Sequence, residues 1–256
     1  MKEKKDARYL RRSRRGGLAI SSGMVGLVAL LVLTAPLASA ASPQKVYTAP
    51  YTGLPVVVTI MATAGCGAAL TVPSWPVFDL TTGIGTTSLS TSAKHCPDAG
   101  GVDDALIIAE VGYNGSTFKQ AATGTHDVVA KLSFSWNAVV KAKPGSTTQL
   151  AASAVYIYAY VYLYDGTNGT TPALGYKTAL SLYSTSGTHS SAKVGAIFSA
   201  TTNSAKLVKN HQYLIEVYVV VDVTAQVSSA GTSTASASLN LATSGDQFKL
   251  DSVTVN

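Results

Sequence analysis

Charged residues are scarce in this sequence and unevenly placed. Asp, Glu, Lys and Arg make up 12% of the 256 residues. Residues 1–40 hold eight Lys or Arg and two acids, a net charge of +6, whereas residues 41–256 hold eleven of each sign. The main part of the chain is therefore neutral. It lacks the basic surface that nucleic-acid binding requires, so we expect no nucleic-acid partner.

Motifs of catalysis are also missing. The four histidines are His95, His126, His189 and His211. None belongs to an H-E-x-x-H motif, and no G-x-S-x-G elbow, P-loop or dinucleotide fingerprint occurs. We interpret the last three histidines as solvated turn residues. The sequence therefore predicts a protein that is not an enzyme and needs no cofactor, with a secreted hydrolase using Glu110 and Glu216 as the third hypothesis.

Cysteine is almost absent, because only Cys66 and Cys96 occur. In an oxidising compartment the simplest arrangement is one disulfide between them. The loop that it closes carries two prolines and many Ser, Thr and Gly residues, so we expect it to be irregular. The neighbouring His95 would permit a Cys/His metal site, but no fourth ligand stands at a suitable spacing.

An acidic cluster follows the second cysteine, in 98-DAGGVDD-104. Asp98, Asp103 and Asp104 are weak candidates for a calcium loop, because carboxylate oxygens in a Gly-rich turn suit that ion. The spacing differs from an EF-hand, and a solvated loop is the alternative that we favour. We expect no bound metal.

The N-terminal 40 residues resemble a targeting segment. A basic stretch, 2-KEKKDARYLRRSRR-15, precedes an uncharged run that ends in the A-x-A box Ala38-Ser39-Ala40. This order predicts a signal peptide cleaved before Ala41. An uncleaved membrane anchor, or pilin-type processing between Arg15 and Gly16, remains open. Each alternative places the body outside the cell or at its surface, and the membrane is a partner only through this segment if it is uncleaved.

Beyond residue 40 the chain alternates apolar and polar residues with the period of β-strands. Strands are expected at 55–64, 105–113, 127–141, 154–164, 178–184, 192–200, 212–227, 232–243 and 247–255. In 127–141 the inward residues include Phe134 and Trp136, and 55–64 is apolar on both faces, which favours a buried strand. Gly, Pro, Ser and Asn turns separate the strands. This pattern predicts an all-β protein, an antiparallel sandwich of jelly-roll or Ig-like type.

We therefore expect two regions, a signal peptide or anchor at 1–40 and one sandwich domain at 41–256. The disulfide-bearing part, 41–113, is joined to the rest by the polar stretch 114–126. Two N-x-S/T sites, at Asn114 and Asn168, fall in expected turns and are candidate glycosylation acceptors.

One strand carries five tyrosines at alternate positions. They are Tyr156, Tyr158, Tyr160, Tyr162 and Tyr164, and aliphatic residues lie between them. Since side chains alternate across a strand, the aliphatic face should enter the core and the tyrosine face should point outward. The tyrosines could be a half-covered ladder, a subunit interface or a sugar-stacking platform.

The stretch 41-ASPQKVYTAPYTGLP-55 precedes the first expected strand and contains three prolines. Val46, Tyr47 and Tyr51 could add to the sheet edge of a neighbouring subunit by β-strand addition. With the Ser, Thr, Ala, Gly, Val and Tyr bias of the body, this suggests an extracellular structural protein that self-associates, such as a filament, pilus-like or surface-layer subunit. The alternative is a carbohydrate-binding or adhesive module that recognises a surface polysaccharide.

Overall fold

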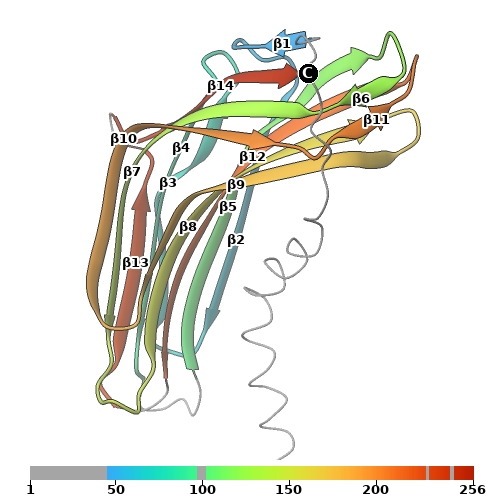
Figure 1. Cartoon of the computed structure of the whole chain (residues 1–256). Helices are drawn as coiled ribbons and strands as arrows, with labels where there is room; N and C mark the ends of the chain where they lie inside the picture. The colour runs from blue at the N-terminus through green and yellow to red at the C-terminus, as the bar shows by residue number, and fades with distance from the viewer. Residues whose placement is uncertain (1–44, 97–101, 229–230, 243–244) are drawn as a thin grey trace, which may run out of the picture. The chain divides into compact units, whose positions relative to one another are not determined.

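The computed structural model describes residues 45–96, 102–228, 231–242 and 245–256, and these residues are mostly β-strand (Figure 1). No helix long and apolar enough to cross a membrane occurs among them. The predicted signal peptide with its Ala38-Ser39-Ala40 box lies outside the described residues, as does Asp98.

Fourteen strands are described. They are β1 (Lys45–Tyr47), β2 (Leu54–Ala64), β3 (Ala68–Asp79), β4 (Ile84–Lys94), β5 (Val102–Lys119), β6 (Gly124–His126), β7 (Val128–Lys143), β8 (Ala151–Asp165), β9 (Thr170–Ser184), β10 (Gly187–Thr201), β11 (Ala205–Leu207), β12 (Gln212–Ser228), β13 (Thr234–Asn240) and β14 (Phe248–Val255).

These strands form two antiparallel sheets that pack face to face. Sheet A has the order β1-β14-β4-β13-β7-β10, with β3 paired to β4, and sheet B has the order β2-β5-β12-β8-β9. The short strands β6 and β11 pair separately. The expectation of an all-β, antiparallel, sandwich-like protein is confirmed. Strands of the 41–113 part pair with later ones, since β5 lies against β12 and β4 against β13.

The core lies between the two sheets, and the period-2 pattern selects the side chains that enter it. Phe134 and Trp136 of β7 are buried, as predicted. In β8 the aliphatic set is fully buried, whereas every tyrosine of that strand is half-buried on the outer face. In β12 the residues Tyr213 to Val227 alternate between buried and half-buried in the same way. The inward faces predicted for these three strands are therefore confirmed.

The disulfide between Cys66 and Cys96 is present, and it joins cysteines that are 30 positions apart. The prediction that its loop is irregular was wrong, because the loop is the β3–β4 hairpin. The two prolines Pro73 and Pro76 argued against a strand, so β3 was not predicted. Prolines are nevertheless tolerated in a strand at a sheet edge. In β4 the inward positions include Thr87 and Thr91, both fully buried, so hydropathy alone did not reveal its alternation.

The calcium candidates are also corrected. Asp103 points inward and is buried, where its carboxylate oxygens accept hydrogen bonds from the backbone N–H of Gly67 (2.9 Å) and of Cys96 (3.3 Å). Asp104 points to the opposite face of β5, as the next residue of a strand must. The two carboxylates therefore cannot share a cation. Within the described ranges, no group of His, Cys, Asp or Glu side chains is arranged to hold a metal.

Strand β2 was predicted to be buried, but it is an edge strand of sheet B that pairs only with β5 (Figure 1). Its apolar residues on both faces are largely exposed. A run that is apolar on both faces is typical of a strand covered on both sides. In this chain the described residues leave most of the strand exposed.

The N-terminal segment was expected to be free for a neighbouring subunit, but it is used within the chain. β1 pairs with β14, with Val46 opposite Thr254. Tyr51 is buried in the core and its hydroxyl donates to the carbonyl of Leu250 (3.0 Å). Tyr47 packs half-buried against the same core. The aromatic side chains fill the chain's own core, so this segment is not an unoccupied donor strand.

Candidate functional site

The outer face of sheet B carries a continuous field of aromatic rings. Its members, called here the tyrosine face, are Tyr156, Tyr158, Tyr160 and Tyr162 of β8, Tyr176 of β9 and Tyr218 of β12. Neighbouring rings along β8 have centroids 6.0 to 6.2 Å apart. Tyr176 and Tyr218 extend the field across the sheet, at 5.8 Å from Tyr160 and 5.7 Å from Tyr162.

Strand register produces this face. Tyr160 lies directly between Tyr176 and Tyr218 on the neighbouring strands. Opposed side chains of antiparallel strands are close enough for aromatic contact. The sequence located the β8 tyrosines, but it gave no indication that Tyr176 and Tyr218 would join them, because that depends on the pairing of strands distant in the chain.

Carboxylates lie among the rings. Glu216 accepts hydrogen bonds from the Tyr218 hydroxyl (2.7 Å) and from Asn114 Nδ2 (2.6 Å). Burial and the Glu216 carboxylate raise the pKa of Tyr218 strongly, so its hydroxyl remains a donor. Asn114 was expected in a turn as a glycosylation acceptor, but it lies within β5 and its amide nitrogen is used by Glu216. Asn168 does lie in an exposed turn, between β8 and β9.

Asp222 of β12 is a desolvated acid of this face. Burial raises its pKa, against a hydrogen bond from Thr224 Oγ1 (2.8 Å), and the negative charge of Asp104 raises it further. Burial, together with Tyr156 and Asp222, raises the pKa of Tyr158 to about 12. The face thus combines aromatic rings with a carboxyl group, that of Asp222, whose ionisation is disfavoured by burial.

We expect Asp222→Asn to stabilise the protein at neutral pH. Since the pKa of Asp222 is higher in the folded than in the unfolded chain, its favourable contribution is present in acid and is lost as the pH rises through the folded pKa. The variant should therefore melt at a higher temperature than the parent at pH 7. The difference should shrink towards zero below about pH 4, where carboxyl groups are protonated.

Asp79 provides the matched control, because its pKa shift has the opposite sign. Hydrogen bonds from Thr82 and Thr81 lower the pKa of Asp79. Asp79→Asn should therefore lose stability at pH 7 and lose little in acid. Thermal melts of both variants between pH 3 and pH 8 check the pair. An Asp222→Asn variant that is less stable than the parent at pH 7 would contradict the assignment.

The outer face of sheet A has the opposite charge. Lys131, Lys141 and Lys143 of β7, Lys94 of β4 and Lys249 of β14 occupy its outward positions. A shallow depression of about 620 Å³ at one end is lined by Lys94, Lys141 and Lys143 together with Ser and Thr side chains. The tyrosine face, by contrast, holds Asp104, Glu110, Glu216 and Asp222 among its outward residues. Lysines predominate on the outer face of sheet A, where Asp79 and Asp251 also lie, and carboxylates predominate on that of sheet B, where Lys119 also lies.

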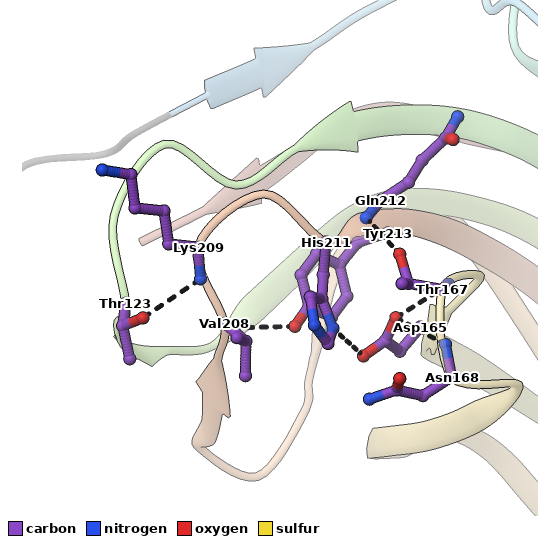
Figure 2. Close-up of polar contacts among 9 residues, drawn as sticks. All are labelled: Thr123, Asp165, Thr167, Asn168, Val208, Lys209, His211, Gln212 and Tyr213. Atoms are coloured by element: carbon purple, nitrogen blue, oxygen red, sulfur yellow. Dashed lines mark hydrogen bonds and ion pairs between the residues drawn. The ribbon is translucent and has the colours of Figure 1, made fainter.

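An Asp–His pair lies at the end of β8 (Figure 2). Nδ1 of His211 is 2.8 Å from Oδ2 of Asp165. Burial disfavours ionisation of Asp165, but hydrogen bonds from His211 and from the backbone N–H groups of Thr167 and Asn168 outweigh it and lower the pKa. His211 was expected to be a solvated turn residue, and this pairing corrects that expectation.

Figure 2 also shows what this pair joins. The backbone N–H of Gln212 donates to Thr167 Oγ1 (2.9 Å), and the Tyr213 hydroxyl accepts from the N–H of Val208 (2.8 Å). No hydroxyl or thiol is hydrogen-bonded to His211 in the described part of the chain. The pair therefore fastens the β8–β9 turn to the start of β12.

His126 is buried as well, so the expectation of a solvated histidine was wrong there too. Its Nε2 lies 2.9 Å from Gln120 Nε2, and its Nδ1 lies 2.7 Å from the Asn256 carbonyl oxygen. An amide nitrogen only donates, so Nε2 accepts and Nδ1 carries the proton. His189 is exposed, as expected.

Comparison with known proteins adds little. No protein family and no curated protein matches this sequence. Among solved structures, the enzymatically active domain of tailspike protein 4 from bacteriophage CBA120 is 9% identical over 72% of this chain and 19% of that one, with a TM-score of 0.16. Structures of the Gx and Gt strains of infectious bursal disease virus are each 14% identical. They cover 85% and 88% of this chain and 45% and 44% of theirs, with TM-scores of 0.16 and 0.18.

The chain therefore spans less than half the length of each of these three proteins. TM-scores this low carry no argument about fold or activity.

Proposed function

We propose that this chain is an exported, non-enzymatic structural protein that associates with identical subunits at the cell surface or outside the cell, as a filament or surface-layer subunit. The observation that carries the proposal is the tyrosine face, a contiguous aromatic surface that no other described part of the chain covers. Aromatic residues are enriched at protein interfaces, and large exposed apolar patches mark contact sites.

Charge complementarity supports an identical subunit as the partner. The lysines on the outer face of sheet A match the carboxylates on the tyrosine face. Stacking face A of one copy on face B of the next is a head-to-tail contact, and such contacts give open filaments when the rotation does not close. Tyrosine suits this position, because its ring is apolar and its hydroxyl bonds to Lys, Ser or Thr.

The strand order also supports a finer description of the fold. We propose a jelly roll rather than an Ig-like sandwich. Eight strands alternate between the sheets in the orders β4-β13-β7-β10 and β5-β12-β8-β9, which is the arrangement of two interleaved Greek keys. Jelly rolls serve both capsid subunits and lectins, so the fold alone does not choose between the two functions.

The second candidate is a carbohydrate-binding or adhesive module. It is favoured by the Glu216–Tyr218 hydrogen bond on the same face as exposed Tyr176, since sugars bind to aromatic rings flanked by carboxylates and amides. In this case the tyrosine face would bind a surface polysaccharide, and the protein would remain a monomer.

Light scattering and negative-stain microscopy of the full chain, recovered as the cell exports it, test the proposal. We expect assemblies much larger than one subunit, and we expect 1 M salt to dissociate them, because the Debye length falls to about 3 Å. Tyr160→Ser should weaken assembly at least tenfold. Val208→Ser, an exposed change in the β11–β12 loop, should not. A parent that stays monomeric, and binds polysaccharide through Tyr160, would establish the second candidate instead.

A further inference from the structure

The free edge of β2 is unusual for a sheet edge. The strand pairs with β5 on one side only, through an unbroken register from Leu54–Asn114 to Ala64–Asp104. Its outward backbone N–H and C=O groups therefore have no strand partner among the described residues. Five of its apolar side chains, on both faces, are 42% to 72% exposed: Leu54, Val57, Val58, Ile60 and Met61. No charged residue occurs in the strand.

The other edges of the described sheets are protected against strand addition. β1 has only three residues and begins with Lys45. β3 contains Pro73 and Pro76 and breaks register twice. β9 also breaks register and carries Lys177. β10 has a bulge after Lys193. Short length, proline, lysine and bulges are the devices that keep sheet edges from pairing. β2 has Pro55 near its start, but its central part contains no proline, no lysine and no bulge.

We propose that β2 is a self-association edge, where β2 of a second copy pairs antiparallel to it about a two-fold axis at Thr59. An unpaired strand edge is satisfied best by another strand, which sets the chemistry of the partner. This register places Thr59 opposite itself, Val58 opposite Ile60 and Val57 opposite Met61. It joins two five-stranded sheets into one, and it keeps outer side chains on the outer face. The inference rests on the proposed self-association and specifies one of its contacts.

The proposed contact is strong enough to hold two subunits. An eleven-residue antiparallel pair makes about ten main-chain hydrogen bonds, which is typical of a stable interface. The exposed apolar side chains of each copy gain cross-strand neighbours from the other copy on the same face of the joined sheet. Since neither β2 carries a charge, the two strands meet without like-charge repulsion.

A lysine substitution tests the edge. Ile60→Lys puts two lysines near the two-fold axis, and we expect it to weaken dimerisation of the full chain at least a hundredfold in sedimentation velocity at 1 M salt, where face-to-face stacking is screened. Ile197→Lys is the matched control. Ile197 is an exposed isoleucine on the bulged edge strand β10, so its variant should dimerise like the parent.

Cysteine cross-linking tests the register. Thr59→Cys places two thiols opposite each other, with Cα atoms about 4.5 to 5.5 Å apart, so a disulfide-linked dimer should form under mild oxidation. Met61→Cys is the control. In the proposed register it faces Val57, and its counterpart lies about 13 Å away along the strand, too far to bond.

The outcomes separate the two proposals. If the parent assembles and Ile60→Lys assembles equally well, the β2 contact is wrong and the proposed function stands. A parent that is monomeric at every salt and protein concentration overturns both. A monomeric parent whose β2 amides resist hydrogen exchange indicates that residues 1–44 cover the edge, and this also overturns the β2 contact. Equal cross-linking by Thr59→Cys and Met61→Cys refutes the register.

Discussion

Trp136→Ala should lower the free energy of unfolding by about 3 to 5 kcal/mol, the range of large-to-small changes in a packed core. The Trp136 side chain is 4% exposed. Its ring lies 6.5 Å from that of Phe134 and 6.2 Å from that of Phe198, and its Nε1 donates to Ser191 Oγ (3.0 Å). Alanine would leave a cavity in the core, and Ser191 would lose its donor. Urea unfolding followed by circular dichroism measures the loss.

The control for this variant is its neighbour. Asn137→Ala changes the exposed residue of the same strand and should cost about 0.5 kcal/mol or less. Ser135 also has an outward position in the alternation of β7, but it is unsuitable as a control. It is buried, and its Oγ accepts the N–H of Gly195 in the β10 bulge (3.0 Å). Equal losses at 136 and 137 would mean that the register of β7 is wrong.

The second large effect is expected from the disulfide. Replacing both Cys66 and Cys96 by Ser should lower the free energy of unfolding by about 3 to 4 kcal/mol, the chain-entropy value for a closed loop of 30 residues. The effect should act through the unfolded chain. In the folded chain Asp103 still holds Gly67 and Cys96 by hydrogen bonds, and β3 and β4 still pair.

Reduction of the parent protein is the matched control for this variant. The reduced parent and the Ser variant should unfold at the same urea concentration, with the native circular dichroism spectrum unchanged. Thiol labelling of the folded, unreduced parent should find no reactive cysteine. Two labelled thiols, or a parent whose stability does not respond to reduction, would show that the bond contributes nothing.

Much of the candidate site could be predicted from the sequence. The alternation in 154–164 located the tyrosines of β8 and their outward direction, because successive side chains of a strand point to opposite faces. The same rule places Glu216, Tyr218 and Asp222 on the outward face of β12. The sequence could not say that these two strands are neighbours.

Other features depend on which strands are neighbours. Asp165 and His211 are 46 residues apart, and no local pattern links them. Asn114 was expected in a turn. It lies instead within β5, where it pairs with β12 on one side and with β2 on the other. Tertiary contacts override local turn chemistry when a strand gains two partners.

The sequence by itself determined the all-β class of the body, the core-facing residues of β7, β8 and β12, and the single disulfide. These follow from the period-2 alternation and from having only two cysteines, and neither depends on which strands are neighbours. The tertiary structure decided that β2 is an edge and β12 is central, although both are rich in valine. It also decided that Tyr51 fills the chain's own core. The physical reason is that strand order depends on long-range packing and hydrogen bonding across the whole chain, which local side-chain patterns do not encode.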